Sequence, residues 1–228
     1  MSHGDTAFLI RGEQADPLIV IASDINIALS RSIFLLPGYG FLPAGTLVGE
    51  VTEASDGRLG AYVPRSIVTP ATAKKLPYLG GAYLLADGAA DAVAKVAIED
   101  SYMFAVGDHL LAVDSDASPV DLGAIVSIDR TTYAHMAVIT GTNNVTTGIT
   151  VAKGGMIAIQ TKTTTPFSLA LGVLVGGYDT GRGPNARGAS AAMALSNIML
   201  RRGCVPNYDA TALSDLSGVA SGDLIVLK

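Results

Sequence analysis

The sequence predicts a mainly β protein, for three reasons. β-Branched residues, which pack well on a pleated sheet, are abundant, with 19 Val, 16 Ile and 18 Thr among 228 residues. The acidic residues are 16 Asp but only 4 Glu, and Lys numbers only 6, whereas exposed helix faces favour Glu and Lys and turns favour Asp. The 26 Gly indicate many turns. A chain of this length buries the core of one large domain or two small ones.

The chain is apolar for a protein of this size, with 49% hydrophobic and 15% charged residues. Its longest apolar stretches span about a dozen residues, whereas a transmembrane helix needs roughly 20, so we expect no membrane partner. The first residues include Asp5 and Glu13 and lack the pattern of a secretory signal. The surplus apolar surface favours burial between subunits, which predicts a homo-oligomer.

The net charge of −5 argues against a nucleic-acid partner, because phosphate binding needs clustered Lys and Arg. The single Cys204 excludes an internal disulfide and fits a chain folded in a reducing cytoplasm.

The first part of the chain predicts an irregular arm followed by a hairpin. We expect residues 1–20 to form a flexible N-terminal arm, with one strand near its end at Leu18–Ala22. Pro37-Gly38 predicts a turn. Two apolar segments, Thr46–Thr52 and Leu59–Val63, flank a Ser-Asp-Gly turn and predict a β-hairpin.

An inserted β module is predicted at 79–162. Linker-like segments at Thr69–Pro77 and Thr161–Pro166 bracket it. The flanks, 1–78 and 163–228, are expected to pack together as one discontinuous β domain. Within the module, short apolar segments recur at the spacing of about 8–12 residues typical of a small barrel or sandwich: His109–Val113, Gly123–Ile128, Ala134–Thr140, Gly148–Ala152 and Met156–Gln160.

The last part of the chain begins with an apolar strand at Leu171–Val175. Periodicity fits a helix or a strand equally well over Ala191–Leu200. Asp209 is a good N-cap for one short helix over Ala210–Leu216, and a final apolar run covers Leu224–Leu227.

No metal site is predicted. His3, His109 and His135 lie far apart without carboxylate or Cys partners at ligand spacing, and His135 is expected on a solvent face. The 114–121 loop begins like a calcium loop, but Pro119 replaces the Gly that such a loop needs, and Ile125 replaces its bidentate Glu. An Asx-rich turn is the better interpretation, and a structural ion stays open there.

The segment Gly181–Ala186 imitates the G-x-G-x-x-A loop that binds dinucleotides. Pro184 removes one of the backbone N–H donors that such a loop aims at a pyrophosphate, and no βαβ pattern surrounds it. We therefore expect a mobile surface loop in which Arg182 and Arg187 make polar contacts, and we predict no cofactor.

No catalytic residue is predicted, and the protein is not expected to be an enzyme. A nucleophile-elbow motif is missing from the sequence, and no His is placed by a motif near a Ser or Asp. The Asp pairs lie in turn-like or cap-like sequence: Asp87/Asp91, Asp114/Asp116 and Asp209/Asp215.

Six short segments, in this order, resemble parts of phage head decoration proteins of the lambda type. They comprise an opening hairpin, a central strand with the loop after it, and a late strand with its PNYDA continuation: Ala44–Thr52, Gly57–Val63, Leu171–Val175, Asp179, Leu195–Gly203 and Pro206–Ala210. The strength of the resemblance lies in the order of the segments. It also favours a strand over a helix at Met193–Leu200.

The resemblance implies a trimer on the outer surface of an icosahedral head, bound to the major capsid protein and stabilising the shell against DNA pressure. The module at 79–162 departs from the smallest family members, and either an outward tip or extra contacts to neighbours would fit it. A tail, baseplate or carbohydrate-binding protein is the alternative function, with Tyr102, Phe104 and Tyr133 as candidate glycan contacts.

Overall fold

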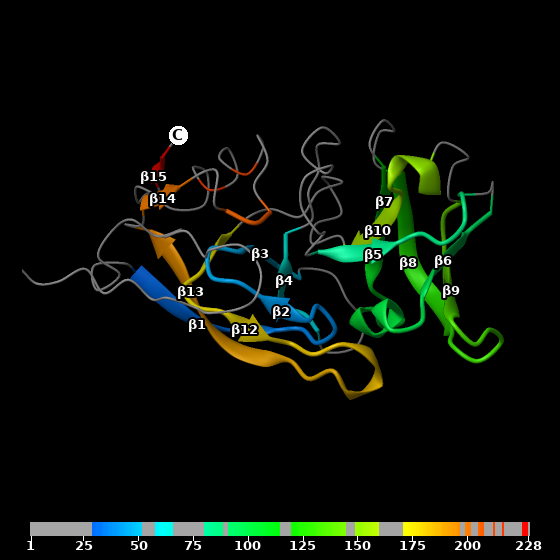
Figure 1. The fold of residues 1–228 in the computed structure, drawn as a ribbon, viewed down its shortest axis with the longest axis horizontal. Helices are drawn as coiled ribbons and strands as arrows, with labels where there is room; N and C mark the ends of the chain where they lie inside the picture. The colour runs from blue at the N-terminus through cyan, green and yellow to red at the C-terminus, as the bar shows by residue number, and fades with distance from the viewer. Residues whose placement is uncertain are drawn as a thin grey trace, which may run out of the picture.

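The computed structural model describes residues 29–51, 58–65, 80–88, 91–114, 120–144, 149–159, 171–196, 199–201, 205–207, 212, 216 and 225–227. These residues form a mainly β fold, which confirms the predicted fold class. Two sheets lie side by side along the long axis of the molecule (Figure 1). No helix among the described residues has the length and apolarity needed to cross a membrane.

The first sheet is a closed five-stranded barrel with the order β1-β13-β11-β3-β4. All its pairs are antiparallel except β1 with β4, which run parallel and meet only at Leu35 and Tyr62. Segments more than 100 residues apart in the chain therefore close one barrel. The strands are β1 (Leu29–Leu35), β3 (Leu47–Glu50), β4 (Tyr62–Pro64), β11 (Gly172–Leu174) and β13 (Ala189–Ser196).

The second sheet has six antiparallel strands in the order β5-β10-β7-β8-β9-β6. All of them fall between β4 and β11 in the chain. The sheet curls, because Leu84 at the end of β5 pairs with Val96 of β6 at the opposite edge. The strands are β5 (Gly81–Tyr83), β6 (Val93–Ala97), β7 (His109–Val113), β8 (Val120–Asp129), β9 (Met136–Gly141) and β10 (Met156–Ile159).

Smaller elements complete the described fold. β2 (Phe41–Leu42) pairs with β12 (Tyr178–Asp179), and β14 (Met199–Arg201) pairs in parallel with β15 (Ile225–Leu227). Three 3₁₀ turns are described: η2 (Asp100–Met103), η3 (Val151–Lys153) and η4 (Gly183–Asn185).

One hydrophobic core runs through both sheets. Alternating side chains point inward, as in β1, where Ile33 and Leu35 are buried while Phe34 is 49% exposed. The same alternation buries Ala137 and Ile139 of β9. The continuous cluster includes barrel residues and residues of the six-stranded sheet: Leu35, Val48, Leu174, Leu110, Ile125, Ile139 and Ile157.

Several predicted elements are confirmed. β3 and β4 pair antiparallel as the expected hairpin, β7 covers His109–Val113 as predicted, and β11 falls within the expected Leu171–Val175. The ambiguous segment after Ala191 is strand, in β13 and β14. The backbone of β13 pairs with β1 on one side and with β11 on the other. These hydrogen-bonded neighbours favour a strand over a helix, a choice that the spacing of apolar residues left open.

The strand predicted at Gly148–Ala152 is wrong, because Val151–Lys153 forms the 3₁₀ turn η3. Gly154 ends the turn with a φ of 73°, a left-handed conformation that Gly adopts readily. The carboxylates of Asp114 and Asp87 accept the N–H groups of Thr150 and Val151, at 3.0 and 2.7 Å. These side chains take the place of a neighbouring strand as hydrogen-bond partners.

Five strands were not predicted: β1, β2, β5, β6 and β12. Ala212 and Leu216 have helical backbone and are buried, within the range predicted as a short helix. The proposed cap Asp209, the strand at Leu18–Ala22, the arm at 1–20 and Cys204 lie outside the described residues. So do both predicted domain limits, near 78 and 162, and the division into domains stays a prediction.

Candidate functional site

A buried polar cluster lies where the barrel meets the six-stranded sheet. Arg58, which precedes β4 in the chain, donates from Nη1 to Oδ2 of Asp108 at 2.6 Å and from Nη2 to the Met103 carbonyl at 2.8 Å. The Arg58 side chain is 12% exposed and that of Asp108 is 1% exposed. A charge-assisted bond in this setting is short and strong, because water does not compete with it.

Local backbone holds the Asp108 carboxylate in place. The turn after η2 donates the Ala105 N–H to Oδ2 at 2.7 Å, and the Asp108 N–H returns to the Ala105 carbonyl at 3.1 Å. The Asp108 carbonyl accepts the Ile125 N–H of β8 at 2.9 Å. Asp108 is thus part of the six-stranded sheet, and Arg58 reaches it from the barrel. The Arg58 guanidinium and the Asp108 carboxylate bind each other directly, an arrangement typical of a structural contact.

The hydroxyl of Tyr39 lies in the same buried region. Burial raises the pKa of this hydroxyl well above its ordinary value; nearby Arg58 opposes the shift and Asp108 adds to it. The hydroxyl therefore stays neutral. Within the described part of the chain it makes no hydrogen bond, so it loses its hydration on folding without full compensation.

We expect Tyr39→Phe to raise the free energy of unfolding by about 1 kcal/mol, because it removes an unsatisfied buried hydroxyl while keeping the ring. Chemical denaturation of the two proteins under identical conditions measures the difference. A loss of stability would show that the hydroxyl has a partner in solution.

Two loops of the barrel complete the contact. The segment Gly38–Gly40 pairs with the β12–η4 loop: Thr180 accepts the Gly38 N–H, and its hydroxyl accepts the Tyr39 N–H and donates to the Gly40 carbonyl. Gly38, with a φ of 102°, lies so close to Met103 of η2 that a Cβ would be 2.6 Å from its Cα. Only Gly permits this approach.

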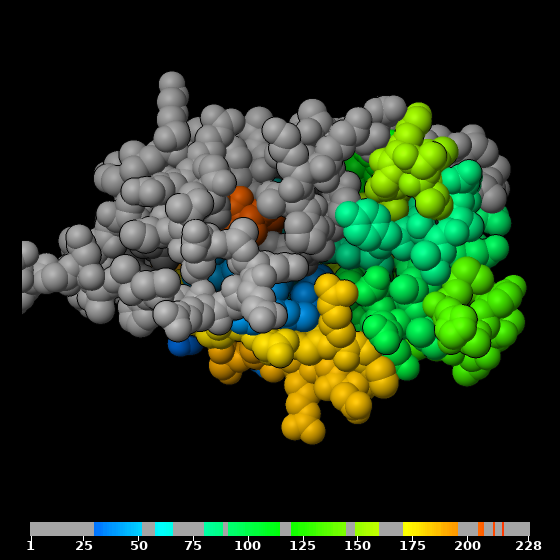
Figure 2. All heavy atoms as spheres, viewed as in Figure 1, coloured from blue at the N-terminus to red at the C-terminus, as the bar shows by residue number. Residues whose placement is uncertain are grey.

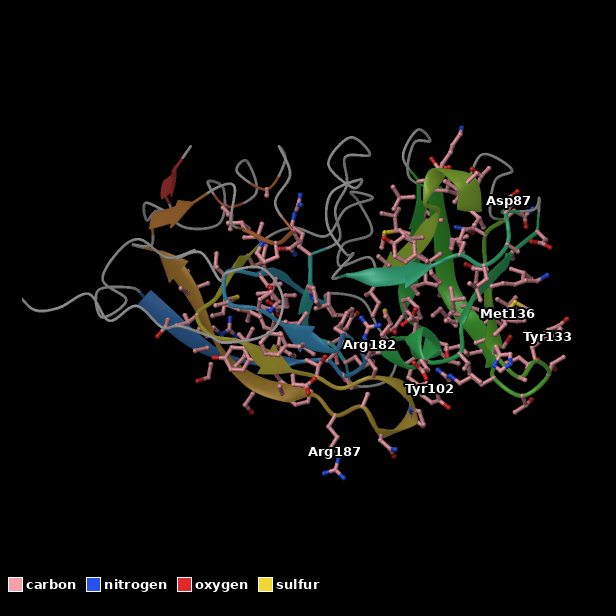
Figure 3. All side chains as sticks on the ribbon, viewed as in Figure 1. Asp87, Tyr102, Tyr133, Met136, Arg182 and Arg187 are labelled. Carbon is pink, nitrogen blue, oxygen red and sulfur yellow. The ribbon has the colours of Figure 1, made fainter. Side chains whose placement is uncertain are left out.

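The dinucleotide-like loop lies at the rim of this junction. Gly183–Asn185 forms η4, which lies against η2, and Figure 2 shows gold atoms of this part of the chain beside the green atoms of the six-stranded sheet region. Arg182, whose side chain is 62% exposed, pairs with Asp100 at 3.5 Å. Burial raises the pKa of the Asp100 carboxyl, while Arg182 opposes the shift and Glu99 adds to it. Arg187 is exposed and points away from the molecule (Figure 3).

A second feature is the part of β1 before Leu35, which pairs with β13 on one side and has no strand among the described residues on its other side. Alternate residues of a strand direct their backbone groups to opposite sides. Leu36 donates to Tyr62 of β4, so the N–H and C=O groups of Ser30 and Ser32 also point away from β13. Both serines are exposed, and no hydrogen bond joins these groups to the described residues. Such an edge is a template for an added strand.

The structure also places the His and Asp residues for which the sequence predicted neither a metal site nor a catalytic site. His109 is partly buried in β7, and His135 is exposed, but in the loop before β9 rather than within a strand. Asp87 and Asp91 accept backbone N–H groups in turns. Asp114 is buried and accepts from Thr150, while the rest of its loop, 115–119, lies outside the described residues. No group of three metal-ligating side chains occurs within the described ranges.

The three candidate glycan-binding aromatics do not share one surface. Phe104 is buried, and the guanidinium of Arg130 lies over the Tyr102 ring at 4.6 Å. Tyr133 is 46% exposed on the loop between β8 and β9, at the far end of the six-stranded sheet (Figure 3). Hydrogen bonds from Thr132 and Thr131 shape this loop and lower the pKa of the Asp129 carboxyl well below its usual range.

Sequence reasoning missed the structural roles of Arg58, Asp108 and Asn207. Asn207 is buried, and its side chain accepts the Leu47 N–H at 2.8 Å and donates to the Leu47 and Arg65 carbonyls, both at 2.9 Å. It thus ties the ends of β3 and β4 together. Asn207 belongs to the PNYDA segment, which was a usable signal; nothing near Arg58 or Asp108 in sequence relates one to the other.

Comparison with known proteins supplies no identification. No family model, no curated protein and no solved structure matches the chain.

Proposed function

We propose that this chain is a virion structural protein that binds the outside of an icosahedral phage head and stabilises it as a decoration protein. The proposal rests on the sequence resemblance and on one structural observation that supports it. Three of the resembling segments, which are far apart in the chain, lie side by side in one closed barrel, where β3 pairs with β4 and with β11, and Asn207 of the PNYDA segment bonds to Leu47 of β3.

In this proposal the partners are the major capsid protein and further copies of the chain, arranged as a trimer. The high apolar content and low charge support burial of surface in such contacts. The role is structural rather than enzymatic, with no cofactor and no nucleic-acid partner. The protein is made in the host cytoplasm and resides on the outer surface of the capsid.

Co-sedimentation with expanded, undecorated heads tests the proposal. We expect the full chain to pellet with the heads until their sites are saturated. Removal of residues 1–16 should leave a folded protein that pellets poorly, because the proposed arm adds binding contacts that three copies multiply. Circular dichroism of the shortened protein controls for folding. Absence of the full chain from the pellet would overturn the proposal, and equal affinity of both proteins would remove the role of the arm.

A further inference from the structure

We propose that residues 100–108 form a coupling segment that fixes the orientation of the six-stranded sheet relative to the barrel, and that Arg130 positions this segment. The coupling segment consists of η2 and the turn after it, which ends at Asp108. The inference concerns a device built into the fold, and it does not depend on the proposed function.

Three separate parts of the barrel side of the molecule contact the coupling segment. Arg58, which precedes β4, donates to the Asp108 carboxylate. Gly38, between β1 and β2, lies against Met103 of η2. Arg182 pairs with the acidic first residue of η2, and η4 lies against the same turn. Parts of the chain that are far apart in the sequence thus converge on one short segment.

The two sides of this contact are complementary in charge. The barrel side contributes the cations of Arg58 and Arg182, and the coupling segment contributes the carboxylates of Asp108 and Asp100. The Asp108 side chain is only 1% exposed. A rotated sheet would separate this buried carboxylate from its cation, which carries a large cost in free energy. The charges therefore favour one orientation.

Apolar packing at the contact selects the same orientation. Tyr39 from the barrel side and Met103 and Phe104 from the coupling segment are buried in one continuous core. A Cβ added at Gly38 would lie 2.6 Å from the Met103 Cα, so the two backbones are in close contact. Close-packed surfaces of this kind have a discrete arrangement rather than a range of angles.

Arg130 holds η2 from the side of the six-stranded sheet. It follows β8 and donates to the Ser101 hydroxyl and carbonyl at 2.8 and 2.9 Å and to the Phe104 carbonyl at 3.3 Å. Its guanidinium also lies over the Tyr102 ring. Within the described residues, all hydrogen bonds of the Arg130 side chain end on the coupling segment. Arg130 therefore acts on the barrel contact only through the segment that it positions.

The other end of the coupling segment is held by backbone. Gly107 donates its N–H to the Ile125 carbonyl of β8, and the Ile125 N–H donates to the Asp108 carbonyl, both at 2.9 Å. This end is thus attached to the sheet independently of Arg130, whereas three hydrogen bonds to η2 and Phe104 come from the Arg130 side chain. Networks of this kind fix the position of the groups that they join. Loss of Arg130 should loosen η2 and leave the strands of the sheet paired.

A distance measurement between the two sheets tests the proposal. Cys204→Ser provides the background, and Ser32→Cys in β1 and Ala152→Cys in η3 receive spin labels; both positions are exposed. We expect double electron–electron resonance to give one narrow distance distribution for this parent. Arg130→Met should broaden the distribution about twofold or more, because η2 no longer has a single position against the barrel. Circular dichroism should show that the strands are kept.

Asp129→Asn is the matched control. Asp129 precedes Arg130 in the chain, but its carboxylate accepts the N–H groups of Thr131 and Thr132 rather than contacting η2. This variant should keep the narrow distribution. A broad distribution in the parent would overturn the fixed orientation, and an unchanged width in a folded Arg130→Met protein would overturn the role of Arg130.

Arg130→Lys takes the place of Arg130→Met if the latter does not fold. Lys keeps the positive charge but has no planar guanidinium to reach Ser101 and Phe104 together. We expect this variant to broaden the distribution as well, and a width equal to that of the parent would contradict the proposal.

Discussion

Arg58→Met is expected to lower the free energy of unfolding at neutral pH by about 3–5 kcal/mol. The change removes the cation that faces Asp108 at 2.6 Å and the donor to the Met103 carbonyl, while the carboxylate stays 1% exposed. A buried carboxylate without its ionic partner costs far more than an exposed one. Urea denaturation, followed by circular dichroism, measures the loss.

The pH dependence of that loss identifies its cause. Without the guanidinium, burial disfavours the charged form of the Asp108 carboxyl, whereas in the unfolded chain an Asp side chain has a pKa of about 3.9. Below the unfolded pKa the carboxyl is neutral in both states, and the penalty for burying its charge is absent; above it the penalty grows until the folded pKa is reached. The Arg58→Met loss should therefore be smaller at pH 4 than at pH 7.

Two variants serve as controls for the Arg58 prediction. Arg58→Met combined with Asp108→Asn removes the buried charge and should recover part of the stability. Arg182→Met breaks the exposed pair with Asp100 and should cost less than about 1 kcal/mol. Equal losses for Arg58→Met and Arg182→Met, or a loss for Arg58→Met that does not vary with pH, would contradict a buried ion pair at the junction.

Asn207→Ala is expected to cost about 2–4 kcal/mol. The Asn207 side chain accepts the Leu47 N–H and donates to the carbonyls of Leu47 and Arg65. The Leu47 carbonyl keeps its bond from the Arg65 N–H, but the Leu47 N–H is left without an acceptor in the described structure. An unmade hydrogen bond at a buried N–H carries the full cost of its desolvation. Thermal unfolding and denaturant titration both measure this loss.

The matched control for Asn207 is Asn185→Ala in the exposed η4 turn, which should change stability by less than about 0.5 kcal/mol. Hydrogen exchange adds a local test: the amide of Leu47 should lose protection in Asn207→Ala more than amides of the six-stranded sheet. A uniform change over both sheets would contradict the role of Asn207 as a tie between β3 and β4.

The predictable part of the fold consists of elements whose signal is local. The β3–β4 hairpin has apolar runs on both sides of a turn, and β7 and β11 are short apolar segments between turn residues. β1 was missed because its outward residues Ser30, Ser32 and Phe34 mix polar and apolar side chains, so its alternation is weak. β5 and β6 lie in Ala-rich and Asp-rich sequence with few β-branched residues.

The candidate site was less predictable than the fold. Arg58 and Asp108 are 50 residues apart, and Leu47 and Asn207 are 160 residues apart. Their pairing depends on how two sheets pack, which no spacing in the sequence encodes. The Gly181–Ala186 loop is the opposite case, because its dinucleotide-like motif is visible in the sequence. In the structure this loop lies at the rim of the junction, where Arg182 pairs with Asp100.

The sequence by itself determined that this protein is mainly β, because residue composition and the spacing of apolar segments act through local geometry. The tertiary structure alone decided that Ala189–Ser196 is a strand, since β1 and β11 supply partners on both sides. It also decided that Thr150 and Val151 bond to the carboxylates of Asp114 and Asp87 rather than to a strand, and that Arg58 meets Asp108. Hydrogen bonds and burial between distant segments exist only after the chain has folded, and they outweigh weak local preferences.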